Sequence, residues 1–403
     1  MNGAFNGAKE RTHPAIRPCK SRRSDPVRNR PVFQCVSPAR GSLRKAAFLR
    51  CVIALLIIVT SFTGCGTQQP SEQDDGRLRI VATIFPPYDF ARAIAGDETR
   101  ADITMLLSPG EEVHSYEPTP MDIKSIQNCD LFLYVGGEND VWVERILENM
   151  GDKKPQTLRL VDLTDTVAEE VVEGMMEERG EHEHEHDAEH AEDAEHAEEA
   201  EHDHEHISHT HSGDSSAEEH EEADEHVWTS PVKAAEITEA IAAKMAEIDP
   251  DNAESYKANA ASYMEEILKV DAAFREIVDN AERRTIVFGD RFPLRYFAEE
   301  YGLEYFAAFP GCSSESEPSA STLAFLIDKV REERIPVVFS IELSNGNIAR
   351  AICESTGAVR RTFHSCHNVT KDEMESGATY VSLMTENLGP VREVLGDKSV
   401  AAE

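Results

Sequence analysis

The chain has 403 residues, 40% of them hydrophobic, which is enough for two lobes of ordinary domain size, each with its own core. Its formal net charge is -36 at pH 7, and so acidic a protein is repelled by phosphate backbones. The composition therefore argues against nucleic acid as a partner and favours a cationic ligand.

Residues 1–64 are predicted to be a basic N-terminal extension and signal peptide rather than part of the fold. The first 50 residues carry twelve Lys and Arg against only Glu10 and Asp25, and the apolar stretch that follows is too short to span a bilayer. The sequence "SFTGC" then ends at Cys65, in the manner of a bacterial lipoprotein signal whose cleavage makes Cys65 the lipidated first residue. An ordinary signal peptide with an incidental cysteine is the alternative. A polar linker, residues 65–76, leads to the folded part.

Residues 77–168 predict a first α/β lobe, which residues 226–248 complete. Apolar, β-prone runs such as "LRIVATIF" and "DLFLYVGG" alternate with helical segments such as "YDFARAIAGD". Strands that alternate with helices indicate parallel βαβ units. Ligands of such sheets bind at the carboxyl ends of the strands.

Residues 169–225 form an acidic, histidine-rich insert that we expect to be disordered, because it has almost no large apolar residue to bury. Its histidines are predicted to bind several metal ions weakly, as an accessory to a site elsewhere. The accessory candidates are His182, His184, His186, His202, His204 and His206. Part of this run satisfies the zinc-protease pattern H-E-x-x-H, but it lacks the apolar face that such a helix packs on a fold.

Residues 249–281 predict one long helix, which begins at Asp249 and Pro250, a favourable cap and first turn. Residues 282–400 then repeat the strand and helix alternation in a second lobe. We therefore expect an α/β fold of two βα-type lobes joined by a long rigid helix, with a ligand site in the cleft between the lobes.

Four cysteines remain after Cys65 in the chain, and an exported protein permits them to form disulfides. Spacing does not select among the pairings, and free buried thiols are the alternative. These cysteines are Cys129, Cys312, Cys353 and Cys366.

Two histidines lie in loops that favour a ligand-binding role. His114 follows the predicted strand "ITMLL" within "LLSPGEEVHSYEPTP", and His226 lies in "DEHVWTSP". Each is ambiguous alone, because most loop histidines are simply solvated. Together, "HSYEPTP", "HVWTSP", the long helix and the acidic insert resemble the zinc- and manganese-binding lipoproteins of metal-ion ABC transporters (cluster A-I, zinc-uptake type), from about Arg77 to Leu395. This resemblance implies a metal ion in the cleft with His114 and His226 as ligands.

The second lobe departs from the family pattern. Zinc members usually carry a third histidine after the first strand of this lobe, but "FGDRFPLRYFAEEYGL" has none, and Asp290 is the nearest donor. Capping or pairing with Arg291 is the alternative role for Asp290. Glu342, in "FSIELSN", lies where the family carries a carboxylate ligand, and an ordinary exposed glutamate is the alternative. His364 and His367, in "FHSCH", are expected to be surface or packing residues near a disulfide.

The resemblance implies a monomeric, lipid-anchored protein on the extracytoplasmic face of the cell membrane. It would bind Zn2+ without catalysis and deliver it to an ABC transporter permease. Carboxylate ligands beside two imidazoles suit Zn2+, and more oxygen donors would favour Mn2+. A metal-dependent surface adhesin or a zinc-buffering lipoprotein is the alternative, because the same architecture serves both. A zinc hydrolase needs an open coordination position beside a general base, and no such pair stands out.

Overall fold

The computed structural model describes residues 76–96, 99–113, 116–151, 154–175, 223–313 and 317–396. All of them belong to one compact unit, Asp74–Glu403. Several predicted features lie outside the described residues: the signal segment, Cys65, His114, and the insert histidines His182, His184, His186, His202, His204 and His206. Among the described residues, no helix combines the length and the apolar character needed to cross a membrane.

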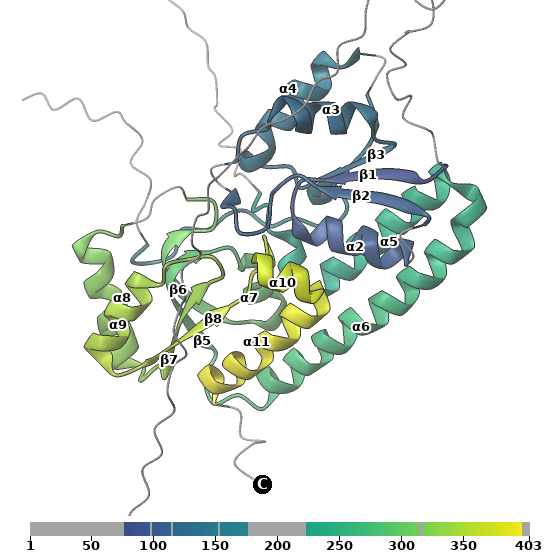
Figure 1. Cartoon of the computed structure of the whole chain (residues 1–403). Coiled ribbons are helices and arrows are strands. Elements are labelled where there is room, and N and C mark those ends of the chain that lie inside the picture. The colour runs from purple at the N-terminus through teal and green to yellow at the C-terminus, as the bar shows by residue number, and fades with distance from the viewer. Residues whose placement is uncertain are drawn as a thin grey trace, which may run out of the picture. The chain divides into compact units, whose positions relative to one another are not determined.

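The first lobe is built on a parallel sheet with the strand order β2-β1-β3-β4 (Figure 1). Its strands are β1 (Leu78–Ala82), β2 (Ala101–Met105), β3 (Leu131–Tyr134) and β4 (Gln156–Arg159). Its helices are α2 (Phe85–Ala95), α3 (Pro120–Asn128), α4 (Val141–Asn149) and α5 (Pro231–Ile248). Alternate residues of β3 face different helices: Phe132 packs in the cluster of α3 and α4, whereas Leu131 and Leu133 pack in that of α2 and α5. Both faces of the sheet are therefore covered, as parallel sheets require.

The predicted long helix is α6 (Ala253–Asp279), which runs between the two lobes (Figure 1). It begins four residues after Asp249, because a short 3-10 turn at Pro250–Asn252 precedes it. The carboxylate of Asp249 stabilises this turn by accepting hydrogen bonds from Asn252 Nδ2 at 2.8 Å and from the Tyr256 hydroxyl at 2.7 Å. The buried residues of α6 recur every three or four positions, so one face of the helix packs along its whole length.

The second lobe repeats the design, with a parallel sheet in the order β6-β5-β7-β8. Its strands are β5 (Thr285–Phe292), β6 (Glu304–Pro310), β7 (Val337–Ile341) and β8 (Val359–Phe363). Its helices are α7 (Arg295–Tyr301), α8 (Ala320–Glu332), α9 (Asn347–Thr356), α10 (Lys371–Ser376) and α11 (Tyr380–Leu395). In Figure 1, α8 and α9 cover one face of this sheet, and α7 and α11 lie on the side of α6. The expected fold of two α/β lobes with a long connecting helix is confirmed.

The four cysteines of the folded part are free thiols. Cys129 and Cys366 are buried, and Cys312 and Cys353 are partly buried. Burial raises the pKa of the Cys366 thiol to about 11, so this group stays protonated and unreactive at neutral pH. The sequence permitted either disulfides or free thiols at these positions, and the structure has free thiols.

Candidate metal centre

The sequence "HVWTSP" holds the backbone of His226 in a defined position. His226 precedes a 3-10 turn, Val227–Thr229, and its carbonyl accepts hydrogen bonds from the Thr229 amide at 3.0 Å and the Thr229 hydroxyl at 2.8 Å. Ser230 then caps α5 by accepting a hydrogen bond from the Lys233 amide, and Pro231 occupies the first turn of the helix. The imidazole of His226 is fully buried, with 0% exposure.

The carboxylate of Asp224 orients the imidazole of His226. Asp224 Oδ1 lies 2.9 Å from His226 Nδ1 and also accepts a hydrogen bond from the His226 backbone amide at 2.8 Å. A carboxylate can only accept, so Nδ1 carries the proton and Nε2 keeps its lone pair. Nε2 is buried and has no hydrogen-bond partner among the residues that the structure describes. This arrangement of carboxylate, imidazole and free Nε2 is the one that proteins use behind metal-binding histidines.

His367 brings a second imidazole to the same place from the loop that follows β8. The rings of His226 and His367 lie 4.7 Å apart between centroids and are nearly perpendicular, at 83°. Trp228 packs against both rings, with centroid distances of 5.6 Å to His226 and 4.8 Å to His367. The fold of the second lobe thus brings His367, 141 residues later in the sequence, beside His226 of the "HVWTSP" motif.

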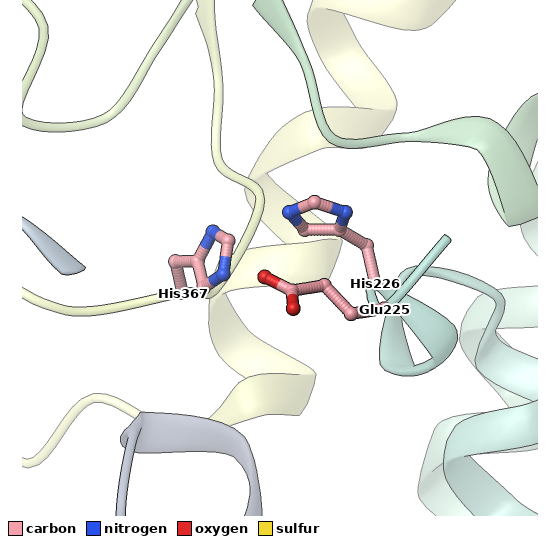
Figure 2. Close-up of side chains that lie close together, drawn as sticks. All are labelled: Glu225, His226 and His367. Atoms are coloured by element: carbon pink, nitrogen blue, oxygen red, sulfur yellow. The ribbon is translucent and has the colours of Figure 1, made fainter. Parts of the chain in front are cut away.

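Glu225 completes a cluster that can hold a metal ion (Figure 2). The ligand atoms of Glu225, His226 and His367 all lie within 4.8 Å of one another. Two donors that bind one Zn2+ at about 2.0–2.2 Å are at most about 4.4 Å apart, so a small side-chain rotation brings these atoms into bonding range. Asn139 holds the carboxylate of Glu225, through its side-chain amide to Oε1 and its backbone amide to Oε2.

The charges in the cluster are unusual for a buried site. Burial raises the pKa of the Glu225 carboxyl above its usual range, although Asn139 and the nearby imidazole of His226 partly oppose this rise. Burial alone would lower the pKa of His226, but the carboxylates of Asp224 and Glu225 outweigh it and leave that pKa raised. The site therefore concentrates negative charge around one imidazole, which favours a bound cation.

Glu342 supports the His367 loop through hydrogen bonds. Its carboxylate accepts from the Ser365 amide at 2.7 Å, the Ser365 hydroxyl at 2.6 Å and the His367 amide at 3.1 Å. The Glu342 side chain is only 6% exposed, so the alternative of an ordinary exposed glutamate does not describe it. In this structure Glu342 places His367, and it also lines the cavity in which His367 lies.

Asp290 lies near the end of β5 and lines a neighbouring cavity of about 150 Å³, which Glu342 also lines. Its Oδ1 accepts a hydrogen bond from the Arg291 amide at 3.0 Å, and within the described part of the chain its buried Oδ2 has no hydrogen-bond partner. Burial raises the pKa of this carboxyl above its usual range. Among the described residues, the cluster within metal-binding range contains His226 but neither Asp290 nor Glu342.

Packing excludes a side chain from one position of β5. The residue before Asp290 is Gly289, and a Cβ there would lie 2.4 Å from the Cα of Ala349 in α9. No side chain fits at this position, because helix and strand backbones approach too closely. Among the described residues, the imidazole that joins His226 in the candidate cluster is that of His367, from the loop after β8.

The expected surroundings of His364 and His367 need correction. Both side chains are buried, and Cys366 between them is a free thiol rather than part of a disulfide. His364 does have a packing role: its Nδ1 accepts a hydrogen bond from the Cys366 amide at 3.0 Å, and its amide donates to Asn387 Oδ1 at 2.8 Å. His367 belongs to the candidate metal centre, and its place just beyond the carboxyl end of β8 was the signal that could have found it.

The two ends of the insert lie side by side in the described part of the chain. Ala168 and Ala223 form an isolated antiparallel bridge, and the Asp224 amide donates to the Val167 carbonyl at 2.9 Å. Asp224 and Glu225, each 2% exposed, are thus ordered by the first lobe just before His226. Glu225 was counted with the insert on composition, and its position next to His226 was the only sequence signal of a role in the site.

Comparison with known proteins agrees with this architecture. The family model described as "Zinc-uptake complex component A periplasmic" (ZnuA) matches residues 80–394. The zinc-binding lipoprotein AdcA of Streptococcus pneumoniae is 28% identical over 362 residues, which are 90% of this chain and 63% of AdcA. The high-affinity zinc uptake system protein ZnuA of Bacillus subtilis is 28% identical over 356 residues, which are 88% of this chain and 99% of that protein.

A solved structure shows the same fold. The crystal structure of the Zn(II)-bound ZnuA-like domain of Streptococcus pneumoniae AdcA superimposes with a TM-score of 0.59 at 26% sequence identity. The match covers 79% of this chain and 99% of that domain. The present chain spans 63% of the length of full AdcA, so it corresponds to part of that relative. Since the family model matches well over half of the sequence, the chain belongs to the ZnuA family of zinc-uptake complex components.

Proposed function

We propose that this protein is the extracytoplasmic zinc-binding component of an ABC transporter, which captures Zn2+ between its lobes and delivers it to a membrane permease. The observation that carries this proposal is His226, whose buried Nε2 has no partner while Asp224 holds its Nδ1. A buried polar atom without a partner costs about 1–3 kcal/mol, so such a site is built to receive a ligand. The function is binding rather than catalysis.

We assign the donors of the zinc site to His226, His367 and Glu225, with His114 as the fourth. The support for His114 is that Val113, immediately before it, lines the same cavity as His367. Three imidazoles and one carboxylate around a tetrahedral ion suit Zn2+, whereas a site richer in oxygen would suit Mn2+.

Asp290 and Glu342 remain predicted contributors to the metal site. Asp290 is available as a further oxygen donor, because its Oδ2 is buried without a partner beside the cavity of His367. Glu342 acts mainly by holding the His367 loop, since its carboxylate accepts three hydrogen bonds from Ser365 and His367 of that loop.

The decisive experiment is competitive zinc titration of the metal-free mature protein without an affinity tag. His226→Ala and His367→Ala should each weaken the tightest zinc-binding event by at least ~10-fold, which is the lower end of the loss expected even for a residue behind the ligands. His209→Ala, in the insert, is the matched control and should leave that event unchanged. Tight zinc binding by the double variant of His226 and His367 would refute this assignment of the metal site. Tighter binding of Mn2+ than of Zn2+ by the parent would refute zinc as the metal.

We also propose that the protein is attached to the extracytoplasmic face of the cell membrane by lipid on Cys65. The support is the "SFTGC" sequence after a short apolar stretch and the similarity to AdcA, a zinc-binding lipoprotein. Cys65→Ala should abolish lipid labelling and release the protein from the membrane fraction or leave it unprocessed. Unchanged labelling of that variant would defeat the proposal.

A further inference from the structure

The loop that carries His367, Ser365–Val369, is hydrogen-bonded to the lobe opposite its own. We call it the histidine loop. Its backbone contacts with the first lobe are Trp228 Nε1 to Ser365 O at 2.9 Å, Phe85 N to His367 O at 3.3 Å, and Gly110 N to Val369 O at 2.8 Å. The loop therefore belongs by sequence to the second lobe and by hydrogen bonding to both.

Asn368 makes the side-chain connection between the histidine loop and the first lobe. Its Nδ2 donates hydrogen bonds to the carbonyls of Ser108 at 2.8 Å and Glu111 at 2.9 Å, and its Oδ1 accepts from the Val369 amide at 2.8 Å. The residue is 1% exposed, so water does not compete for these bonds. Both amide protons and the amide oxygen are thus committed, and the orientation of this side chain is determined by its partners.

The segment that Asn368 holds, Ser108–Val113, forms one wall of the cavity in which His367 lies. Glu111, Glu112 and Val113 line that cavity on the side of the first lobe, and His367 lines it on the side of the second. Glu112 also forms an ion pair with Arg291 of the second lobe at 3.2 Å. Contacts such as these connect the two walls, and Asn368, 1% exposed, contributes two of the hydrogen bonds.

We infer that Asn368 is a positioning residue for metal capture, which keeps the Ser108–Val113 wall against the histidine loop and so slows release of the bound ion. This inference rests on the proposed function. Ligands that the folded protein already holds together lose little conformational entropy when the ion binds. Loss of a residue that supports the ligands typically lowers metal affinity by about 10–100-fold. Among related complexes such changes fall mainly on the dissociation rate.

Asn368→Asp is the sharpest test, because it keeps the volume of the side chain and the acceptor for the Val369 amide. It replaces the two donated hydrogen bonds by a carboxylate that faces two carbonyl oxygens. Asn368→Ala is a milder variant that also removes both donors. Asn259→Asp is the matched control, since Asn259 on α6 likewise donates from a partly buried amide to a carbonyl, that of Ile94, at 2.9 Å.

The measurement is the rate at which a chelator in excess removes Zn2+ from the full mature protein, together with the visible spectrum of the Co2+-loaded form. We expect release from both Asn368 variants to be at least ~10-fold faster, and the Co2+ spectrum to change, while Asn259→Asp releases zinc within about two-fold of the parent rate. The spectrum reports on ligand geometry, which a loss of stability alone does not alter.

Folded Asn368 variants with the parent's release rate and Co2+ spectrum would overturn the inference, even if their melting temperatures fell. If Asn368→Asp did not fold, Asn368→Ala would be judged by the same two measurements. A parent protein without tight zinc binding would overturn the proposed function and this inference together. A parent with tight binding and unaltered Asn368 variants would overturn the inference alone.

Discussion

The pairing of Asp224 with His226 leads to a graded prediction for two substitutions. Asp224→Asn keeps the shape of the side chain and an oxygen that can accept from His226 Nδ1, but it removes the negative charge. Asp224→Ala removes the acceptor as well, so nothing then selects the tautomer with a free Nε2. We expect the parent protein to bind zinc most tightly, Asp224→Asn less tightly, and Asp224→Ala least tightly.

The magnitude follows from burial and geometry. Asp224 and His226 are 2% and 0% exposed and their atoms lie 2.9 Å apart, so solvent screens this contact little. A hydrogen bond to a charged group contributes about 1.5–3 kcal/mol and one between neutral groups about 0.5–1.5 kcal/mol, a difference of about 1–1.5 kcal/mol. The Asn variant should therefore lose about 10-fold in zinc affinity, and the Ala variant about 100-fold, the upper end of the range for such partners.

The pH dependence gives the prediction a sign. Asp224 raises the pKa of His226, so protons compete with zinc in the parent from a higher pH than in Asp224→Asn. The parent's advantage should be greatest at alkaline pH and should shrink as pH falls through the raised pKa of His226. Competition titration of metal-free protein with a chromophoric chelator, repeated across pH 6 to 9, measures this directly.

Asp130→Asn is the control for loss of a carboxylate as such. Asp130 pairs with Arg79 at 2.8 Å and immediately precedes β3, at the amino end of the sheet and away from the candidate site. Its substitution should leave zinc affinity unchanged at every pH. Equal affinities of Asp224→Asn and the parent at alkaline pH, or a difference that widens as pH falls, would refute the reasoning.

Three further predictions concern the core, a buried acid and the insert. Ile267→Ala, at a fully buried position of α6, should lower the free energy of unfolding by about 2–5 kcal/mol in urea denaturation. Leu268 is 44% exposed, so Leu268→Ala should change it by about 0.5 kcal/mol or less. Equal losses for the two variants would contradict the orientation of the helix. Burial raises the pKa of Asp140 to about 7, so the folded state keeps this proton at pH values where the unfolded state loses it. The metal-free protein should therefore lose up to about 1.4 kcal/mol of stability per pH unit as pH rises from about 4 to about 7. Asp140→Asn should remove this contribution to the slope. Identical slopes for parent and variant would contradict that assignment. Deletion of residues 181–220 should lower the number of zinc ions bound in calorimetry and leave one tight event, and loss of the tight event would mean that the insert holds the main site.

Local signals in the sequence were enough to predict most of the fold. Alternating apolar strands and helices indicated parallel sheets, because that pattern arises within each βαβ unit and needs no knowledge of distant contacts. The sequence of α6 and the Asp249–Pro250 pair likewise predicted a long helix. The helix begins later than predicted, after a turn in which Asp249 accepts hydrogen bonds from Asn252 and Tyr256. His226 was predicted as a ligand because "HVWTSP" resembles a family motif, and that short motif also contains Ser230, the cap of α5.

The members of the candidate metal centre other than His226 come together only in the tertiary structure. Close packing of Gly289 on Ala349 leaves no room for a side chain at that one position of β5, and the β5 sequence alone does not predict this contact. His367 lies beside His226 in a loop, Ser365–Val369, whose amides donate to Glu342 of the second lobe and whose Asn368 donates to carbonyls of the first lobe. Periodicity reports which face of an element is buried, but convergence of side chains from separate elements depends on how their loops pack, and that is determined by the folded chain as a whole.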